Sequence, residues 1–305
     1  MARYSFLQAD VFTQTGLTGN PLAVFPTAEG LDAGTMQSLA REMNLSETTF
    51  VFASEQATRR IRFFTPTAEI PLAGHPTIGT WWILAEEGFL KLPDHGIERV
   101  TQETDAGILP VDIHLEGGKP REVVMMQALP EFGEIVEDVR GLGEALGGNK
   151  DIVLEHPKPQ VVSTALPQLM VPIRSSTDLK SLPSGGAGAT LVSLLRKFGT
   201  DCAMCYAADT VDGGPMIRCR MFAPGLGVPE DPATGSAAGA LGSYLVWHNV
   251  MRPHDGVAAI VVEQGQEIGR PSKIDVEVVV GNGGEITEVR VGGKAVTVIT
   301  GEVTL

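Results

Sequence analysis

Two stretches of the chain share one pattern, and this repeat limits the folds that the sequence can adopt. RFFTPTAEIPLAGHPTIGT spans residues 62–80, and RMFAPGLGVPEDPATGSAAG spans residues 220–239. Four residues match at a separation of 158 positions: Arg62 with Arg220, Phe64 with Phe222, Pro66 with Pro224 and Pro71 with Pro229. After a two-residue slip, His75 aligns with Asp231 at a separation of 156 positions. A single pair of this kind indicates a divergent duplication rather than a solenoid array, so we expect two related halves.

The ends of the two stretches are rich in small residues. In the same register Gly79 aligns with Gly235, and Thr80 aligns with Ser236. Each stretch therefore predicts a strand, a corner and then a helix. The two helices are predicted over residues 77–88 and 234–250.

Short strand-like segments separated by turns make up most of the remaining sequence. The 305 residues include 36 glycines and 20 prolines, which are spread along the chain and indicate many tight turns. Antiparallel strands with embedded helices fit an α+β class better than a regular βαβ alternation. We therefore predict two pseudo-symmetric lobes in which mostly antiparallel strands surround one central helix.

Charge and hydropathy exclude several classes of partner. The net charge of −14 would repel phosphate backbones and no basic stripe is present, so we expect no nucleic-acid partner. No apolar run approaches the roughly 18 residues of a membrane span. The N-terminal MARYSFLQADVF lacks the apolar core of a signal peptide, so a cytoplasmic location is expected.

The three cysteines are predicted to be core residues. Their odd number and low density argue against a disulfide framework. Cys202 and Cys205 form a C-x-x-C, but no second pair of ligands follows at zinc spacing. The surrounding DCAMCYAA has the pattern of a buried strand, and Cys219 lies in another strand-like segment.

The two predicted helix starts suggest a site for a carboxylate. Helix N-termini offer unpaired N–H groups and a partial positive charge. Gly74, Gly235 and Ser236 would allow backbone amides to approach a ligand closely. If the two halves enclose a cleft, a substrate carboxylate held there has its α-proton acidified, because the negative charge that develops is stabilised.

Proton transfer also requires an acid and a base. Glu47 stands beside an apolar strand in NLSETTFVF, where desolvation would raise its pKa towards that of a general base. His75 and Asp231 could orient a substrate or relay protons.

Simpler interpretations of the same residues stay open. Asp231 followed by proline fits an N-cap and the first helical position. His75 could satisfy a carbonyl in its turn, Glu47 could be an ordinary surface carboxylate, and the glycines could serve turn geometry alone. The repeat favours a functional role for His75 and Asp231, because two different titratable residues stand at aligned corners.

Five segments together resemble the PhzF family of phenazine-biosynthesis-like isomerases. They follow one another in order through nearly the whole chain: DVFTQTGLTGNPLAVF, NLSETTFV, AGHPTIGT, EDPATGSAAGALGSYL and QEIGRPSKI. The resemblance implies a diaminopimelate epimerase fold, in which each lobe is a strand barrel around a central helix. It also implies that the final residues return to the first lobe. The lobes are then residues 1–120 plus 294–305, and residues 121–293.

The resemblance also assigns roles to residues. The acid/base glutamate of the family falls on Glu47, with His75 and Asp231 as further catalytic candidates. The expected substrate-binding residues are Ser46, Gly74, Gly235 and Ser236. Epimerases of this fold use a pair of cysteines at the two corners, whereas this chain has none there. What remains is a proton shift by Glu47.

The leading hypothesis is therefore a cofactor-independent isomerase or epimerase that acts on a small carboxylic acid. The resemblance implies no nucleotide, pyridoxal or metal cofactor, and it suggests a homodimer. The alternative hypothesis is a catalytically silent protein of the same fold that binds a small molecule or serves as a scaffold.

Overall fold

The computed structural model describes residues 1–208 and 216–305. The chain forms two compact units, of which unit 1 contains residues 1–126 and 292–305 and unit 2 contains residues 127–291. Each unit combines a mostly antiparallel set of strands with a few helices, so the predicted two-lobed α+β fold is confirmed. Among the described residues, no helix is long and apolar enough to span a membrane.

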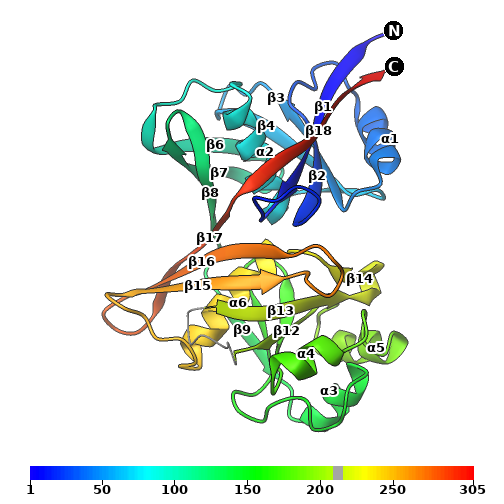
Figure 1. Ribbon diagram of the computed structural model, residues 1–305, viewed down its shortest axis with the longest axis vertical. Coiled ribbons are helices and arrows are strands. Elements are labelled where there is room, and N and C mark those ends of the chain that lie inside the picture. The colour runs from blue at the N-terminus through cyan, green and yellow to red at the C-terminus, as the bar shows by residue number, and fades with distance from the viewer. Residues whose placement is uncertain (209–215) are drawn as a thin grey trace. The chain divides into compact units, whose positions relative to one another are not determined.

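Unit 1 is built from strands that follow one another around a buried helix (Figure 1). The pairing order is β18–β1–β2–β3–β4–β6–β7–β8, in which β2–β3 and β4–β6 are parallel and the other pairs are antiparallel. Each parallel pair needs a crossover connection, and helices α1 and α2 lie in these connections. The elements are β1 (Arg3–Val11), β2 (Asn20–Phe25), α1 (Ala33–Met43), β3 (Glu47–Phe52), β4 (Arg59–Phe64), β5 (Glu69–Ile70), α2 (Gly74–Glu86), β6 (His95–Thr104), β7 (Gly107–Glu116), β8 (Lys119–Gln127) and β18 (Ala295–Thr304).

Helix α2 is the central helix of unit 1. Every residue from His75 to Ala85 is buried, as expected for a helix that is apolar on all sides. A Cβ at Gly79 would lie 2.6 Å from the side chain of Val11, so this glycine allows close packing between helix and strand. The helix begins three residues before the predicted start, because Pro76 is tolerated in the first turn of a helix. Gly88 follows its end with φ of +74°, as a helix-terminating glycine should.

Unit 2 repeats the strand path of unit 1 (Figure 1). Its pairing order is β9–β10–β11–β12–β13–β15–β16, again with two parallel pairs, β11–β12 and β13–β15. Helix α6 lies in the connection of the second pair, and every residue from Ala237 to Leu245 is buried. The elements are β9 (Glu131–Ile135), α3 (Val139–Ala145), β10 (Gln160–Ser163), β11 (Pro167–Pro172), α4 (Ser176–Ser181), α5 (Ala189–Lys197), β12 (Ala203–Ala207), β13 (Met216–Ala223), the 3-10 helix η1 (Pro224–Leu226), β14 (Val228–Asp231), α6 (Gly235–Trp247), β15 (Val257–Gln264), β16 (Ser272–Val280) and β17 (Ile286–Gly293).

Two ion pairs recur at matching places in the two units. Arg62 contacts Glu69 at 2.6 Å in unit 1, and Arg220 contacts Glu230 at 2.7 Å in unit 2. A second pair, Arg60–Glu103 at 3.8 Å, has its counterpart in Arg218–Glu263 at 3.6 Å. Each of the first two arginines also lies over a phenylalanine two residues further along its strand. The same types of ion pair and cation–π contact on corresponding strands support the duplication that the sequence predicted.

The structure corrects the register of the repeat after these strands. Helices α2 and α6 begin at Gly74 and Gly235, which are 161 positions apart, and Glu69 and Glu230 have the same separation. His75 therefore corresponds to Ser236, whereas the sequence analysis had aligned it with Asp231. The change from 158 to 161 positions places three extra residues in the second copy, in the turn that contains η1. The prediction that His75 and Asp231 occupy equivalent corners was wrong.

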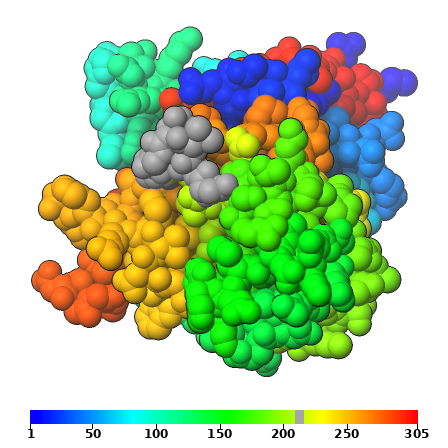
Figure 2. Space-filling model, turned by 60° about the horizontal axis from the view of Figure 1, so that its bottom comes forward, coloured from blue at the N-terminus to red at the C-terminus, as the bar shows by residue number. Residues whose placement is uncertain are grey.

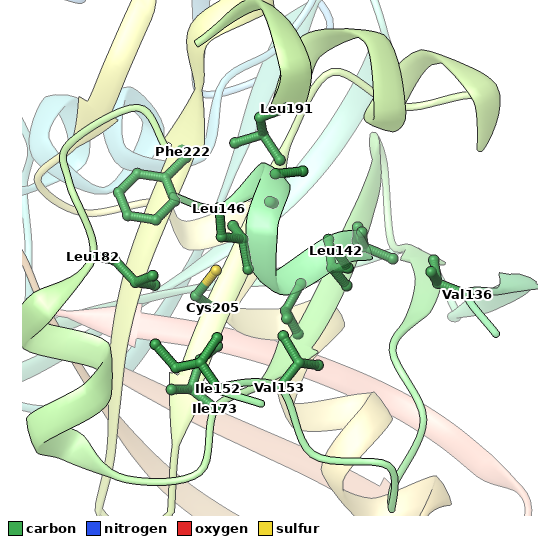
Figure 3. Close-up of a cluster of buried hydrophobic side chains, with 14 of the residues drawn as sticks. Val136, Leu142, Leu146, Ile152, Val153, Ile173, Leu182, Leu191, Cys205 and Phe222 are labelled. Atoms are coloured by element: carbon green, nitrogen blue, oxygen red, sulfur yellow. The ribbon is translucent and has the colours of Figure 1, made fainter. Parts of the chain in front are cut away.

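The hydrophobic core of unit 2 encloses one of the three cysteines. Aliphatic side chains from α3, β11, α5 and β12 pack together, and the sulfur of Cys205 lies among them near Leu146, Leu182 and Phe222 (Figure 3). All three cysteines are buried and free, which confirms their interpretation as core residues. The segment that contains α3, α4 and α5, coloured green, forms part of the surface of unit 2 (Figure 2).

Candidate functional site

Glu47 is the first residue of β3, and its carboxylate is held in an apolar setting. Strand β3 runs parallel to β2, with Glu47 in register with the buried Leu22. The side chain of Glu47 is 19% exposed, but Oε2 is buried and accepts no hydrogen bond within the described residues. A buried carboxylate oxygen without a donor is unfavourable when charged, so this position favours the protonated form.

The pKa of Glu47 is raised above the usual range of a glutamate. Desolvation by burial is the main cause, and a hydrogen bond from Ser46 acts in the opposite direction. The expected rise of this pKa is confirmed, and the interpretation of Glu47 as an ordinary surface carboxylate is wrong. A carboxyl group with such a pKa exchanges its proton closer to neutral pH, as a general acid or base needs to do.

His75 lies next to this carboxylate. It is the second residue of α2, and its Nε2 atom is 3.5 Å from Oε2 of Glu47. His75 is 7% exposed, so both side chains lie in a setting from which most water is excluded. Unit 1 therefore brings together two of the predicted catalytic residues, a carboxyl group and an imidazole.

Ser46 and Asn20 complete the polar surroundings of Glu47. The hydroxyl group of Ser46 donates to Oδ1 of Asn20 at 3.2 Å. Asn20 is 1% exposed and begins β2. The sequence does not mark Asn20 as a site residue, because an Asn-Pro pair between two strand segments is typical of a turn. Only the parallel pairing of β2 with β3 brings it beside Ser46.

The N-terminus of α2 carries no side-chain cap. Ala73 occupies the N-cap position and makes no capping hydrogen bond, while Pro76 has no N–H group. Gly74, the first helical residue, is half-buried. A helix start of this kind keeps its partial positive charge for an anion, and here it adjoins His75.

Unit 2 holds the other predicted residues at the start of α6. Gly235 and Ser236 are the first two helical residues, and Thr234 is the N-cap. Asp231 is the last residue of β14, so its interpretation as the N-cap of this helix was wrong. Its carboxylate instead accepts a hydrogen bond from the hydroxyl group of Thr234.

Glutamine and threonine side chains fix the first turn of α6. Gln127 donates to the carbonyl of Gly235 at 3.0 Å and accepts from the hydroxyl group of Thr164 at 2.6 Å, and this hydroxyl group also lies 3.3 Å from the carbonyl oxygen of Ser236. The N–H group of Thr234 donates to the side chain of Gln264 at 3.2 Å. No local pattern in the sequence marks this set, because its members lie far apart in the chain and match no motif.

The counterpart of Glu47 in unit 2 is a cysteine. Thr48 is paired with Phe64 and Ala203 with Phe222, so the residues just before them, Glu47 and Cys202, occupy matching places. Burial, with a smaller contribution from nearby carboxylates, raises the pKa of Cys202 to about 12. A thiol with this pKa stays protonated near neutral pH, so only the copy in unit 1 carries a group suited to proton exchange. Within the described residues, no group of three or more His, Cys, Asp or Glu side chains could hold a metal ion.

Comparison with known proteins gives matches over almost the full length. The family model described as phenazine biosynthesis-like protein, PhzC-PhzF, matches residues 9–301. An uncharacterized isomerase of Clostridium acetobutylicum is 38% identical over 99% of both chains. The trans-2,3-dihydro-3-hydroxyanthranilate isomerase of Pseudomonas chlororaphis is 34% identical over 99% of this chain and 100% of its own. A solved PhzF-family phenazine biosynthesis protein of Bacillus anthracis has a TM-score of 0.90 at 29% identity, with both chains fully covered.

Proposed function

Because the chain belongs to the phenazine biosynthesis-like PhzC-PhzF family of isomerases, we propose that it moves a proton between two carbon atoms of a small carboxylic acid without a cofactor. Glu47 is the general acid and base in this proposal. It takes a proton from a carbon atom close to the substrate carboxylate and returns it to another carbon atom. Substrate and product then have the same composition, and no external oxidant or reductant is needed.

The observation that carries the proposal is the environment of Glu47. Its carboxylate has a raised pKa and lies 3.5 Å from His75 in a setting from which most water is excluded. A base whose pKa lies nearer the working pH holds its proton long enough to deliver it to carbon. His75 is placed to respond to the change of charge on Glu47 during the transfer, and Ser46 to orient the carboxyl group.

The helix starts bind the substrate in this proposal. Gly74 in unit 1, and Gly235 and Ser236 in unit 2, offer backbone amides or a hydroxyl group to carboxylate oxygens, while Asp231 contacts the polar part of the substrate. Both segments lie within the part of the chain that the family model matches. A homodimeric state and a cytoplasmic location are further parts of the proposal.

A panel of small acids incubated in deuterated buffer tests this function. The panel includes amino acids, hydroxy acids, benzoates and trans-2,3-dihydro-3-hydroxyanthranilate, the substrate in the name of the Pseudomonas relative. Thermal shift reports binding, and mass spectrometry reports deuterium gained at carbon. We expect at least one acid to stabilise the protein against thermal unfolding and to gain deuterium at a carbon atom. Binding of acids without any exchange would instead support a catalytically silent binding protein, and a protein partner without a small-molecule shift would support a scaffold.

A further inference from the structure

Gln168 is a buried glutamine with one side-chain atom that the fold does not use. It lies in β11 and is 1% exposed. Its Nε2 atom donates to the hydroxyl oxygen of Ser236 at 3.1 Å. Its Oε1 atom is buried and has no hydrogen-bond partner among the described residues. Buried amide oxygens are nearly always satisfied, so an orphan acceptor beside a helix start indicates a missing donor.

The contact with Gln168 also determines what Ser236 can do. A hydroxyl group has one hydrogen atom to donate and two lone pairs to accept with. Gln168 occupies a lone pair of Ser236, and within the described chain the hydroxyl hydrogen donates to no protein atom. Ser236 is the second residue of α6, so the helix holds its backbone in place with this hydrogen available. A carboxylate oxygen is a suitable acceptor for it.

We propose that Gln168 is a specificity-determining residue that accepts a hydrogen bond from an amino or hydroxyl group of the substrate. The two atoms of its amide lie side by side, so Oε1 is adjacent to the place where Ser236 donates to a carboxylate. A substrate bound there presents to Gln168 whatever group stands next to its carboxylate. The substrate class is therefore a carboxylic acid with an N–H or O–H donor on the carbon atom that bears the carboxylate or on the next carbon atom. This inference rests on the proposed function for the binding of the carboxylate at Ser236.

Gln160 provides a matched control. It is also a buried glutamine of unit 2, 8% exposed, in the neighbouring strand β10. Its Nε2 atom donates to the carbonyl of Gly133 at 3.1 Å, and its Oε1 atom contacts Nε2 of His248 at 2.9 Å. Both of its polar atoms therefore have partners in the fold, whereas one atom of Gln168 has none.

The test uses pairs of acids that differ only in the donor: 2-aminobenzoate and 2-hydroxybenzoate against benzoate, and lactate and alanine against propionate. Calorimetric titration gives the ratio of dissociation constants within each pair. In the wild-type protein we expect the donor-bearing acid of the preferred pair to bind roughly tenfold more tightly, as one satisfied hydrogen bond in a buried site provides. Gln168→Met should reduce that ratio to about one, and Gln160→Met should leave it unchanged.

Two further variants separate the parts of the inference. Ser236→Ala should weaken the binding of both acids of a pair to a similar extent, because it removes a contact to the shared carboxylate. Gln168→Asn keeps an amide with both an N–H donor and an acceptor on a shorter side chain, so it should retain part of the preference even if Gln168→Met folds poorly. An unchanged ratio in Gln168→Met, no preference in the wild-type protein, or no binding by any acid in these pairs would overturn the inference. Deuterium exchange in the panel described above reports on the proposed function separately, because it can persist without any donor preference.

Discussion

Oε2 of Glu47 lies 3.5 Å from Nε2 of His75, on the first turn of the central helix of unit 1. The two residues come from different elements, the start of β3 and the start of α2, which the parallel pairing of β2 with β3 and the burial of α2 bring together. Burial raises the pKa of the carboxyl group above its usual range. The first two predictions follow from this relationship.

Replacing Glu47 by glutamine should stabilise the protein at neutral and alkaline pH. The folded state binds the Glu47 proton more tightly than the unfolded chain, so the stability of the wild-type protein falls as the pH rises through the raised pKa. Glu47→Gln removes this loss and should raise the free energy of unfolding by about 1 kcal/mol at pH 8, with no gain near about pH 4. Urea unfolding at both pH values measures the difference. The exposed Glu55→Gln serves as the control and should show no such dependence on pH; a Glu47→Gln variant less stable than wild type at pH 8 would contradict the prediction.

Replacing His75 by glutamine should slow proton transfer much more than it weakens binding. The imidazole is buried beside Glu47, so its loss removes the group that responds to the charge of the carboxylate. Losses of roughly 100-fold or more in kcat are typical of an acid–base partner. Steady-state kinetics on an acid that exchanges deuterium gives kcat and KM. His95→Gln, at an exposed position in β6, should leave both unchanged. A normal kcat in His75→Gln would exclude the role assigned to His75.

The two arginine–glutamate pairs of the repeat should differ in their contribution to stability. The side chains of Arg220 and Glu230 are 3% and 1% exposed, whereas those of Arg62 and Glu69 are 21% and 28% exposed. Arg220→Met leaves a buried carboxylate without its partner and should lower the free energy of unfolding by about 3–5 kcal/mol, against about 1 kcal/mol for Arg62→Met. Urea unfolding of both variants measures this contrast. Equal losses would show that burial does not distinguish the pairs.

The cysteines should be unreactive in the folded enzyme and unnecessary for its activity. All three are buried, and burial raises the pKa of each thiol. Iodoacetamide at pH 8 should therefore label none of them in the native protein and all three in urea, as counted by mass spectrometry. Deuterium exchange should continue at the normal rate after treatment of the native protein. Rapid native labelling together with loss of exchange would indicate a cysteine mechanism.

Local patterns in the sequence were sufficient to predict the burial of Glu47 and the approximate starts of two helices. The apolar strand after Glu47 indicated desolvation, and the glycine-rich segments indicated the starts of α2 and α6. The sequence also contained the duplication, because the arginine and phenylalanine of each copy lie on matching strands.

The register of the repeat could not be read from the sequence. The turn before Asp231 holds three more residues than the corresponding turn of unit 1. Each stretch also has a proline directly after its corner residue, Pro76 after His75 and Pro232 after Asp231, and these prolines suggested an incorrect alignment of the two corners. Strand pairing and the positions of Glu69 and Glu230 resolve the ambiguity. Asn20, Gln127 and Gln168 were missed for a related reason, since long-range pairing brings each beside the site residues and no local pattern marks them.

Solvent deuterium exchange in Glu47→Gln tests the central claim most directly. The acid that gains deuterium fastest in the panel is incubated with wild-type protein and with the variant, and calorimetry confirms that both bind it. We expect the variant to bind the acid while its rate of deuterium incorporation at carbon falls to the uncatalysed level. Exchange at the wild-type rate in Glu47→Gln would contradict the role of this carboxylate as the group that moves the proton.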